Sequence, residues 1–382
     1  MSKQISVTFF SNFLLHHQTP FCQAMVKRLK DNFKFVATVD IPQDRLDMGY
    51  KDFRQESYAI NAYESKEKYS QAMELANNSD VVILGDAPIE FIKDRLSKGK
   101  LTFKYSERFF KNGYWRILDP RVFKQRYIQD IKFRHSNLHM LCASAYTAKD
   151  CKFIGCYKNK TYKWGYFPEV KKYDDVESLV DNKKENSILW VGRLLKLKHP
   201  ELAVRVAEKL KKKNIPFSLE IIGEGEMENK IKKLITKKNL ADKVTLKGFI
   251  PIEEVREKME KADIFLFTSD RNEGWGAVLN ESMNSACGVV ASKEIGSVPY
   301  LIKDGQNGLV FNRRKKNDIV KKVELLLKDK KLKRNVQLNA YNTLISTWNA
   351  EDAADRLLAL IDLINSNKAI NVLDGPASKD AY

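Results

Sequence analysis

Two glutamates frame a glycine-rich turn in the second half of the chain. Glu273 precedes Gly-Trp-Gly, and Glu281 follows eight residues later, in the segment ADIFLFTSDRNEGWGAVLNESM. Glycines at 274 and 276 let the backbone approach a ligand closely, and a helix predicted to begin near Ala277 presents unpaired N–H groups that suit phosphate. Carboxylates repel phosphate, so their presence here indicates hydroxyl partners. The pattern predicts a diphosphate flanked by a sugar and a ribose.

A pair of cations occurs upstream of this turn. Arg193 and Lys198 lie in VGRLLKLKHPE, directly after the apolar run SILWVG, which is predicted to be a strand. Open parallel sheets bind ligands at the carboxyl ends of their strands. A planar guanidinium and a mobile ammonium together can neutralise a diphosphate leaving group. A third loop, Gly223–Gly225 in IIGEGE, fits either a ligand loop or a simple tight turn.

Short β-branched runs alternate with longer amphipathic, lysine-rich stretches along the whole chain. Near-continuous apolar strands separated by helices favour an α/β fold of parallel sheets with helices on both faces. The expected strands are Ile5–Phe10, Phe33–Thr38, Val81–Gly85, Leu138–Ala143, Ser187–Val191, Ser218–Ile222, Val244–Lys247, Ile264–Phe267, Gly288–Ala291 and Leu309–Phe311. The expected helices of the second half include Glu201–Lys213, Met227–Lys238 and Ile252–Lys261.

Length and composition set the broad class. The 382 residues favour two domains, and 43% hydrophobic residues exclude a disordered chain. No apolar stretch approaches the length of a membrane span, and the N-terminus is typical of a first strand rather than a signal peptide, so we expect a cytoplasmic protein. The cysteines lack zinc-site spacing, so reduced thiols and no metal are expected. They are Cys22, Cys142, Cys151, Cys156 and Cys287.

The alternation of strands and helices stalls around Tyr166–Asn186, where a proline and mixed charges indicate a linker. We therefore expect a first domain over 1–165, a linker over 166–186 and a second domain over 187–348. After Trp348, Asn349 is a predicted N-cap of a helix whose apolar residues recur at helical spacing. The final DGPASKDAY is expected to be a loosely held tail.

Five segments in this order and spacing resemble glycosyltransferase family 4. They are VGRLLKLKHPELA, IIGEGEMENKI, VTLKGFIPIEEV, ADIFLFTSDRNEGWGAVLNESM and EIGSVPYLIKDGQNGLVF, and the resemblance covers about residues 185–350. It implies a retaining, nucleotide-sugar-dependent enzyme of the GT-B fold, with two Rossmann-like domains facing a central cleft. The first domain would bind the acceptor and the second the nucleotide sugar, and the segment 349–382 would cross back to the first domain.

The resemblance also implies roles for individual residues. Glu273 would contact donor-sugar hydroxyls, Glu281 the ribose, and Arg193 with Lys198 the diphosphate. Because this pair of cations stands in for a metal, no metal or other cofactor is expected, and the nucleotide sugar is a substrate. The remaining donor contacts, many of them through the backbone, would come from Gly223, Phe249, Ile250, Gly274, Trp275, Gly276 and Ala277.

The loop after the first strand departs from the family pattern. Relatives often carry glycines there, whereas this chain has SNFLLHHQTPF. Asn12, His16 and His17 would lie at the mouth of the cleft, and each histidine either binds acceptor or phosphate or is simply packed or exposed.

A second departure occurs in LTFKYSERFFK, where Glu107 stands near the place of a histidine in many relatives. Glu107 is a candidate catalytic residue that accepts a hydrogen bond from a donor or acceptor hydroxyl; the alternative is an ion pair with Arg108 or Lys104. SNFLLHHQ, YSERFFK and KWGYFPE together resemble a bacterial subgroup of capsular and exopolysaccharide synthesis.

A strongly basic segment spans residues 92–134. It holds 13 lysines and arginines against four acids, a local charge of +9, with aromatic residues interleaved. Basic residues with interfacial aromatics are what binding to an anionic membrane surface requires. The alternative is a solvated basic face with the aromatics in the core.

Three functions remain in view. The first is a retaining transfer of a hexose from a nucleotide diphosphate sugar, with UDP favoured by family frequency, to a lipid-linked or oligosaccharide acceptor at the inner face of the plasma membrane. The second is a non-catalytic sugar- or nucleotide-binding partner subunit of the same fold. The net charge of +18 alone suggests a nucleic-acid-binding protein, but no recognition motif accompanies it, so no nucleic-acid partner is expected.

Overall fold

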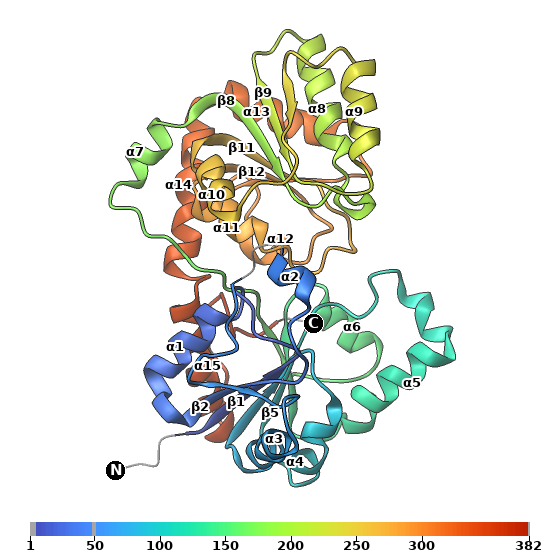
Figure 1. Cartoon of the computed structure of the whole chain (residues 1–382), viewed down its shortest axis with the longest axis vertical. Helices are drawn as coiled ribbons and strands as arrows, with labels where there is room; N and C mark the ends of the chain where they lie inside the picture. The colour runs from blue at the N-terminus through green and yellow to red at the C-terminus, as the bar shows by residue number, and fades with distance from the viewer. Residues whose placement is uncertain (1–4, 48–50, 381–382) are drawn as a thin grey trace. The chain divides into compact units, whose positions relative to one another are not determined.

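The computed structural model describes residues 5–47 and 51–380. The chain divides into two compact units, the first formed by Met1–Glu169 with Asn349–Tyr382 and the second by Val170–Trp348. Each unit is a parallel β-sheet with helices packed against it (Figure 1). The expected α/β architecture of two Rossmann-like parallel-sheet domains is therefore confirmed.

The first unit contains a seven-stranded sheet. Its order is β3-β2-β1-β4-β5-β6-β7, with parallel pairing throughout. The order reverses between β1 and β4, so the connections leave these two strands toward opposite edges of the sheet. The strands are β1 (Val7–Ser11), β2 (Phe33–Ala37), β3 (Ala59–Asn61), β4 (Val81–Leu84), β5 (Thr102–Ser106), β6 (Leu138–Cys142) and β7 (Thr161–Lys163).

The helices of the first unit follow the same chain order. They are α1 (Thr19–Leu29), α2 (Gln43–Asp47), α3 (Lys66–Asn78), α4 (Lys93–Ser97), α5 (Pro120–Gln129), α6 (Thr147–Phe153) and α15 (Ala350–Asn365), with short 3₁₀ turns that include η3 (Tyr114–Leu118). Side chains of α3, α4 and α6 share one buried apolar cluster with β1, β2, β4 and β6. Figure 1 shows α1 beside α15.

The second unit has a six-stranded parallel sheet of order β10-β9-β8-β11-β12-β13. Its strands are β8 (Lys184–Val191), β9 (Ser218–Ile222), β10 (Val244–Leu246), β11 (Ala262–Phe267), β12 (Gly288–Ser292) and β13 (Leu309–Phe311). Its helices are α7 (Val176–Asp181), α8 (Glu201–Lys212), α9 (Glu228–Lys237), α10 (Ile252–Lys261), α11 (Val278–Asn284), α12 (Val298–Leu301), α13 (Asp318–Lys328) and α14 (Lys330–Ser346).

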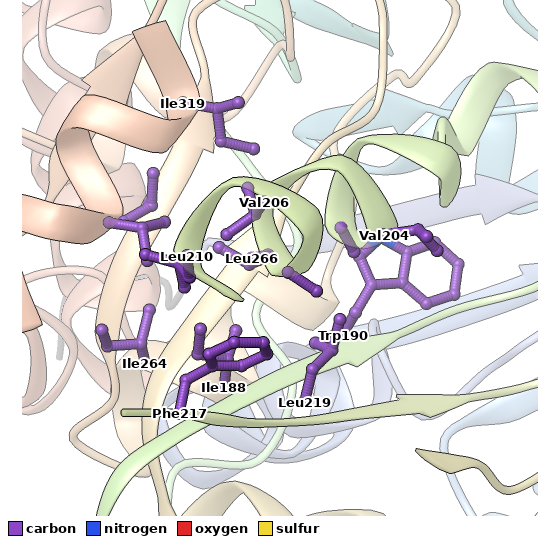
Figure 2. Close-up of a cluster of buried hydrophobic side chains, with 14 of the residues drawn as sticks. Ile188, Trp190, Val204, Val206, Leu210, Phe217, Leu219, Ile264, Leu266 and Ile319 are labelled. Carbon is purple, nitrogen blue, oxygen red and sulfur yellow. The ribbon is translucent and has the colours of Figure 1, made fainter. Parts of the chain in front are cut away.

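Helix α8 shows why these residues form these elements. Val204, Val206 and Leu210 recur at helical spacing and are buried. Figure 2 shows them above β8 and β9, where Ile188 and Leu219 face the helix. The polar residues of α8 lie on the opposite side, so burial of one apolar stripe fixes the helix on the sheet.

The C-terminal segment completes the first unit. Asn349 caps α15, its side chain accepting a hydrogen bond from the Asp352 amide at 2.9 Å, which confirms the predicted N-cap. Arg28 of α1 holds this helix through Glu351 at 2.8 Å and Asp355 at 2.6 Å.

The expectation of a loose tail after α15 is wrong. The Lys163 amide donates to Ser378 O at 2.8 Å, and the Asp380 amide donates to Thr161 O at 2.9 Å, so the tail lies along β7. Residues 377 and 378 are buried. Backbone pairing, which carries no local sequence signal, orders the segment.

The segment expected to be a linker is also structured. Residues 176–181 form α7, and β8 begins at Lys184 rather than at 187. Val180 of α7 packs in a buried cluster with Tyr341 of α14. The Asp175 side chain caps the helix by accepting a hydrogen bond from the Ser178 amide at 2.9 Å.

Candidate functional site

The strand order of the second unit reverses between β8 and β11, which are neighbours in the sheet. Ligands of open α/β sheets bind outside the carboxyl ends of strands at such a reversal. Arg193 and Lys198 follow β8, and Glu273 follows β11. The topology therefore places these predicted residues together at the carboxyl ends of the two central strands of this sheet.

Lys198 and Glu273 form a close ion pair. The Lys198 Nζ and Glu273 Oε2 atoms are 2.5 Å apart, and the Ser269 hydroxyl donates to the same oxygen at 2.9 Å. Thr268 connects this pair to the core, because its hydroxyl donates to Lys198 O at 2.6 Å and accepts from the Trp190 indole at 2.8 Å. A cation and a carboxylate are thus held side by side on a rigid support.

Two glycine-dependent contacts shape the loops around this pair. Gly276 has a φ of +76°, and a Cβ there would lie 2.3 Å from the Phe267 ring. Gly223 has a φ of +130°, and a Cβ there would lie 2.1 Å from Gly192 O. Gly223 also donates to Gly248 O at 2.7 Å, so it packs the loops after β8, β9 and β10 together. Gly223 therefore packs one loop against another, as a glycine of a simple tight turn does.

The loop that carries Arg193 is fixed by its neighbour. The Leu194 amide donates to Glu224 O at 2.7 Å, and the Met227 amide donates to Leu194 O at 2.8 Å. The Arg193 side chain is exposed beyond this anchored backbone. Glu224 Oε1 also accepts from the Phe249 amide at 3.2 Å, so that amide already has a partner while the Phe249 ring is exposed next to Ile250.

Trp275 contributes a buried indole. Its ring is fully buried and its Nε1 donates to Asn280 Oδ1 at 2.9 Å. The Trp275 side chain therefore belongs to the core beneath the loop, and only the backbone of Gly274–Ala277 remains for a ligand. Helix α11 starts at Val278, next to the predicted Ala277; it has seven residues and carries Glu281 in its first turn.

Glu281 lines a cavity of the second unit, of about 360 Å³. Helix α10 supplies most of its lining, including Arg256. Burial raises the pKa of the Glu281 carboxyl, and the charge of Arg256 partly opposes that rise. Arg256 itself donates to Asn284 Oδ1 at 2.7 Å. The structure thus separates the two glutamates, one against Lys198 and one at the α10–α11 cavity.

His199 was not predicted as a site residue, and it completes the support of Lys198. His199 adopts a left-handed conformation with φ 51°, rare outside glycine and asparagine, and its ring lies between two carboxylates. Nδ1 is 2.8 Å from Glu201 Oε1, and Nε2 is 3.1 Å from Asp270 Oδ2. The hydrogen bond with Glu201 has the largest effect and raises the pKa of the imidazole. Burial lowers this pKa, but the hydrogen bond with Asp270 raises it further, so the net shift is upward.

The first unit has its own cavity, of about 790 Å³, at the point where its strand order reverses. Asn12 after β1 and Asp86 after β4 line it, and the Asn12 amide donates to Asp86 Oδ2 at 3.1 Å. Asp86 was not predicted, although an acid directly following the apolar run VVILG is a signal of a strand-end site. His17 lines the same cavity and stacks on Tyr166 at 5.6 Å.

Both predicted histidines are neutral near pH 7. Burial lowers the pKa of His16 to about 4, and burial with the charges of His16 and Arg45 lowers the pKa of His17 to about 3. They can therefore exchange hydrogen bonds with a ligand but supply no positive charge to a phosphate.

Glu107 also lines this cavity, with a partner different from those expected. Its Oε2 pairs with Lys111 at 2.6 Å, and its Oε1 accepts from the Tyr166 hydroxyl at 2.8 Å. The alternative interpretation, an ion pair with Arg108 or Lys104, is not found, because those cations face other carboxylates. Lys104 contacts Asp130, and Arg108 contacts Asp150.

The basic segment 92–134 is only partly at the surface. Arg95 is fully buried and donates to backbone carbonyls, including Ala76 O at 2.6 Å, and its burial lowers its pKa to about 10. Lys104 and Arg126 are also buried. These three charges cannot face a lipid surface, so the charge count of the sequence overstates the exposed excess.

Two further features concern metals and membranes. Within residues 5–47 and 51–380, no group of three or more His, Cys, Asp or Glu side chains is arranged to hold a metal ion. In the same part of the chain, no helix combines the length and apolar character of a membrane span.

Replacing His199 by Gln should destabilise the protein more at pH 6 than at pH 8. The folded-state pKa of His199 lies above its unfolded value of about 6.5, so its contribution is fully present below that value and is lost as pH rises through the folded pKa. Urea unfolding midpoints of both proteins at both pH values measure this. The exposed His135→Gln serves as control, and an equal effect of H199Q at both pH values would show that its charge does not matter.

Comparisons with known proteins find glycosyltransferases. The family described as Glycosyl transferases group 1 matches residues 172–343. The chain is 26% identical to an uncharacterized glycosyltransferase of Methanocaldococcus jannaschii over 82% of its own length and 86% of that protein. It is 33% identical to N-acetylgalactosamine-N,N'-diacetylbacillosaminyl-diphospho-undecaprenol 4-alpha-N-acetylgalactosaminyltransferase of Campylobacter jejuni, over 40% of each chain.

Solved structures show the same fold. HepE of Anabaena, in complex with UDP, aligns with a TM-score of 0.68 at 13% identity over 95% of this chain and all of that one. A glycosyltransferase from Rickettsia africae aligns with a TM-score of 0.65 at 14% identity, over 96% of this chain and all of that one. Residues 172–343 are thus similar to glycosyl transferases group 1, and the comparisons support a transferase with the GT-B fold.

Proposed function

We propose that this protein is a retaining glycosyltransferase of family 4 that moves a hexose from a UDP-sugar to a saccharide acceptor in cell-surface polysaccharide synthesis. The observation that carries the proposal is the Lys198–Glu273 pair, 2.5 Å apart at the strand-order reversal of the second unit. One donor molecule presents both a diphosphate and a sugar, which are the partners that an adjacent cation and carboxylate select.

The chemistry follows from charge. The bond between the sugar C1 and the diphosphate oxygen breaks, and Lys198 with the exposed Arg193 stabilises the negative charge that develops on the leaving group. The acceptor hydroxyl forms the new bond to C1 from the same face, and its proton passes to the departing diphosphate oxygen. Glu273 binds sugar hydroxyls and stabilises the positive charge on the ring. Glu281 binds the ribose from the α10–α11 cavity.

Relatives support the choice of substrates. The UDP in the HepE complex favours a uridine nucleotide, and the Campylobacter enzyme is named for a diphospho-undecaprenol acceptor. By analogy, we assign a lipid-linked saccharide acceptor to this protein. It then works at the cytoplasmic face of the plasma membrane as a peripheral protein.

The membrane contact belongs to the segment η3–α5. Its most exposed apolar residues are Trp115 (63% exposed), Leu118 (82%), Phe123 (50%) and Tyr127 (48%), which we call the outer aromatic patch. The exposed Arg121 and Lys124 lie on the same helix. Aromatics with adjacent cations suit the interface of an anionic bilayer, where each cation contributes about 1 kcal/mol.

Replacing Arg193 or Lys198 by alanine should lower turnover by about 100-fold or more, because each removal costs about 3 kcal/mol of leaving-group stabilisation. UDP release from a panel of UDP- and GDP-sugars, with and without a lipid-linked acceptor, measures this. The exposed Lys196→Ala is the control on the same turn. Full turnover in both R193A and K198A would contradict the donor-site assignment, and sugar binding without any turnover would favour a non-catalytic subunit.

Glu273→Gln and Glu281→Gln should fail in different ways. Glu273 meets the sugar, whose charge changes during the reaction, so E273Q should reduce kcat about 100-fold and leave UDP affinity nearly intact. Glu281 meets the ribose, which changes little, so E281Q should weaken UDP binding about 10-fold or more. Calorimetric titration with UDP beside turnover separates the two effects. The reverse pattern would mean that the two ends of the donor are exchanged.

A quadruple variant, Trp115→Ser, Phe123→Ser, Arg121→Gln and Lys124→Gln, should bind anionic vesicles at least 10-fold more weakly than the native protein. Its two lost cations alone contribute about 2 kcal/mol. Co-sedimentation with phosphatidylserine-containing vesicles measures the loss, and high salt should weaken native binding because it screens exposed charges.

The double variant Leu373→Ser with Lys368→Gln is the matched control for this experiment. It removes one exposed apolar and one exposed basic residue of the first unit outside the outer aromatic patch. Equal vesicle binding by the quadruple variant and this control would place the membrane contact elsewhere.

A further inference from the structure

The cavity of the first unit carries an excess of positive charge. Two carboxylates line it, Asp86 and Glu107. Against them stand six lysines and arginines from the segments that follow β2 and from β5 to α5: Arg45, Lys104, Arg108, Lys111, Arg116 and Arg126. Its volume of about 790 Å³ is in the range of small-molecule sites and leaves room for more than one chemical group.

Partners inside the protein cancel only part of this charge. Lys104 at 2.6 Å and Arg126 at 2.9 Å share one carboxylate, that of the buried Asp130. Asp130 also accepts a hydrogen bond from the Tyr157 hydroxyl at 2.7 Å. Two cations on one carboxylate leave one positive charge in the cavity wall, and that charge is costly to bury without a further anion.

Arg108 is only loosely held by its carboxylate partner. Its Nη2 lies 3.5 Å from Asp150 Oδ1, at the limit of a hydrogen bond, and its Nε is buried with no hydrogen-bond partner among the described residues. The other Asp150 oxygen is already used by the amides of Phe109 at 2.7 Å and Phe110 at 3.1 Å. A guanidinium of this kind is suited to phosphate oxygens, which accept from its fork of donors.

The acidic groups of the cavity lie on different elements. Asp86 follows β4 and is held by Asn12, whereas Glu107 follows β5 and is held by Tyr166 and Lys111. Hydrogen-bonded carboxylates of this kind bind the hydroxyls of a saccharide. The cavity therefore offers partners for a sugar and, separately, for an anion.

Helix α5 separates this cavity from the outer aromatic patch. Val122, Gln125, Arg126 and Gln129 line the cavity and recur at helical spacing on one side of α5. Phe123 and Tyr127, stacked with centroids 6.4 Å apart, lie on another side and are exposed. One short helix thus faces an anion-binding cavity on one side and carries apolar surface on the other.

We propose that this cavity binds the phosphate or diphosphate group that joins the acceptor saccharide to an apolar chain. Arg108 and Arg116 bind the phosphate oxygens, Asp86 and Glu107 bind the saccharide, and the chain leaves toward the outer aromatic patch. This proposal rests on the proposed function and adds that the anionic linkage, rather than the sugar alone, is recognised.

The direct test is binding of inorganic pyrophosphate to the full chain by calorimetric titration. Because the donor site can also bind pyrophosphate, the measurement uses the Arg193→Gln, Lys198→Gln double variant as its parent. In that background, Arg108→Gln and Arg116→Gln should each weaken binding about 10-fold, whereas Arg121→Gln should not. Arg121 is the matched control, since it lies on α5 with a side chain that is 90% exposed and outside the cavity.

The Arg116→Gln variant is the more reliable of the two tests of phosphate binding. Removing Arg108 leaves the buried Asp150 without its cation and can impair folding, so Arg116→Gln, at a half-buried position, keeps the test valid. Unchanged pyrophosphate binding in R116Q would overturn the proposal. Tighter binding of glucuronate than of pyrophosphate to the same parent would also overturn it, because a carboxylated sugar would then be the ligand.

A kinetic comparison separates this proposal from the proposed function. With the native donor site, R116Q should raise the KM for a soluble phosphate-linked saccharide about 10-fold and leave the KM for the same saccharide without phosphate unchanged. An equal rise for both acceptors would overturn the proposal while leaving the transferase intact. Absence of any transfer by the native protein would contradict the proposed function and leave the pyrophosphate result standing on its own.

Discussion

The hydroxyl of Thr268 holds the second unit's site together. It accepts a hydrogen bond from the Trp190 indole at 2.8 Å and donates one to Lys198 O at 2.6 Å. Trp190 is fixed by the core between β8 and α8, so the position of the turn that carries Lys198 is set by packing far below it. A methyl group in place of the hydroxyl would leave an indole N–H and a carbonyl unpaired in a buried place, which costs more than the bonds themselves contribute. His199 and Asp270 secure the same turn from its other side.

The two units pair their cations with carboxylates in different ways. In the second unit, Lys198 and Glu273 neutralise one another directly. In the first unit, Asp130 and Asp150 lie fully buried behind the cations that they hold. Buried carboxylates fix the direction of each cation. Removing these charges from water costs free energy, which the attraction between the two partners must offset. Rigid cations of this kind lose little freedom when an anion arrives.

Much of the fold was predictable from the sequence because apolar runs and helical spacing are local. The helix α10 over Ile252–Lys261 and the cap at Asn349 were located to the residue, and the Gly-Trp-Gly turn does precede a helix. What local patterns cannot show is pairing across the chain. Lys104 pairs with Asp130, which is 26 residues away, and Arg95 donates to the carbonyl of Ala76. The charge count of the segment 92–134 therefore included cations that are buried in the folded protein. Trp275 was predicted as a donor contact from its place in the turn, and its sequence neighbours give no sign that its indole is buried against Trp348 and Tyr300. The roles of the individual site residues stay predictions.

The tail along β7 has a consequence for solubility. β7 is the last strand of the first sheet, so its outward N–H and C=O groups form an open edge. An unpaired edge is a template on which another chain can add a strand, and natural proteins protect such edges. Residues 377–380 occupy this one, with Tyr162 and Lys379 in an antiparallel bridge. Residues 377–380 thus protect this edge against β-pairing with another chain.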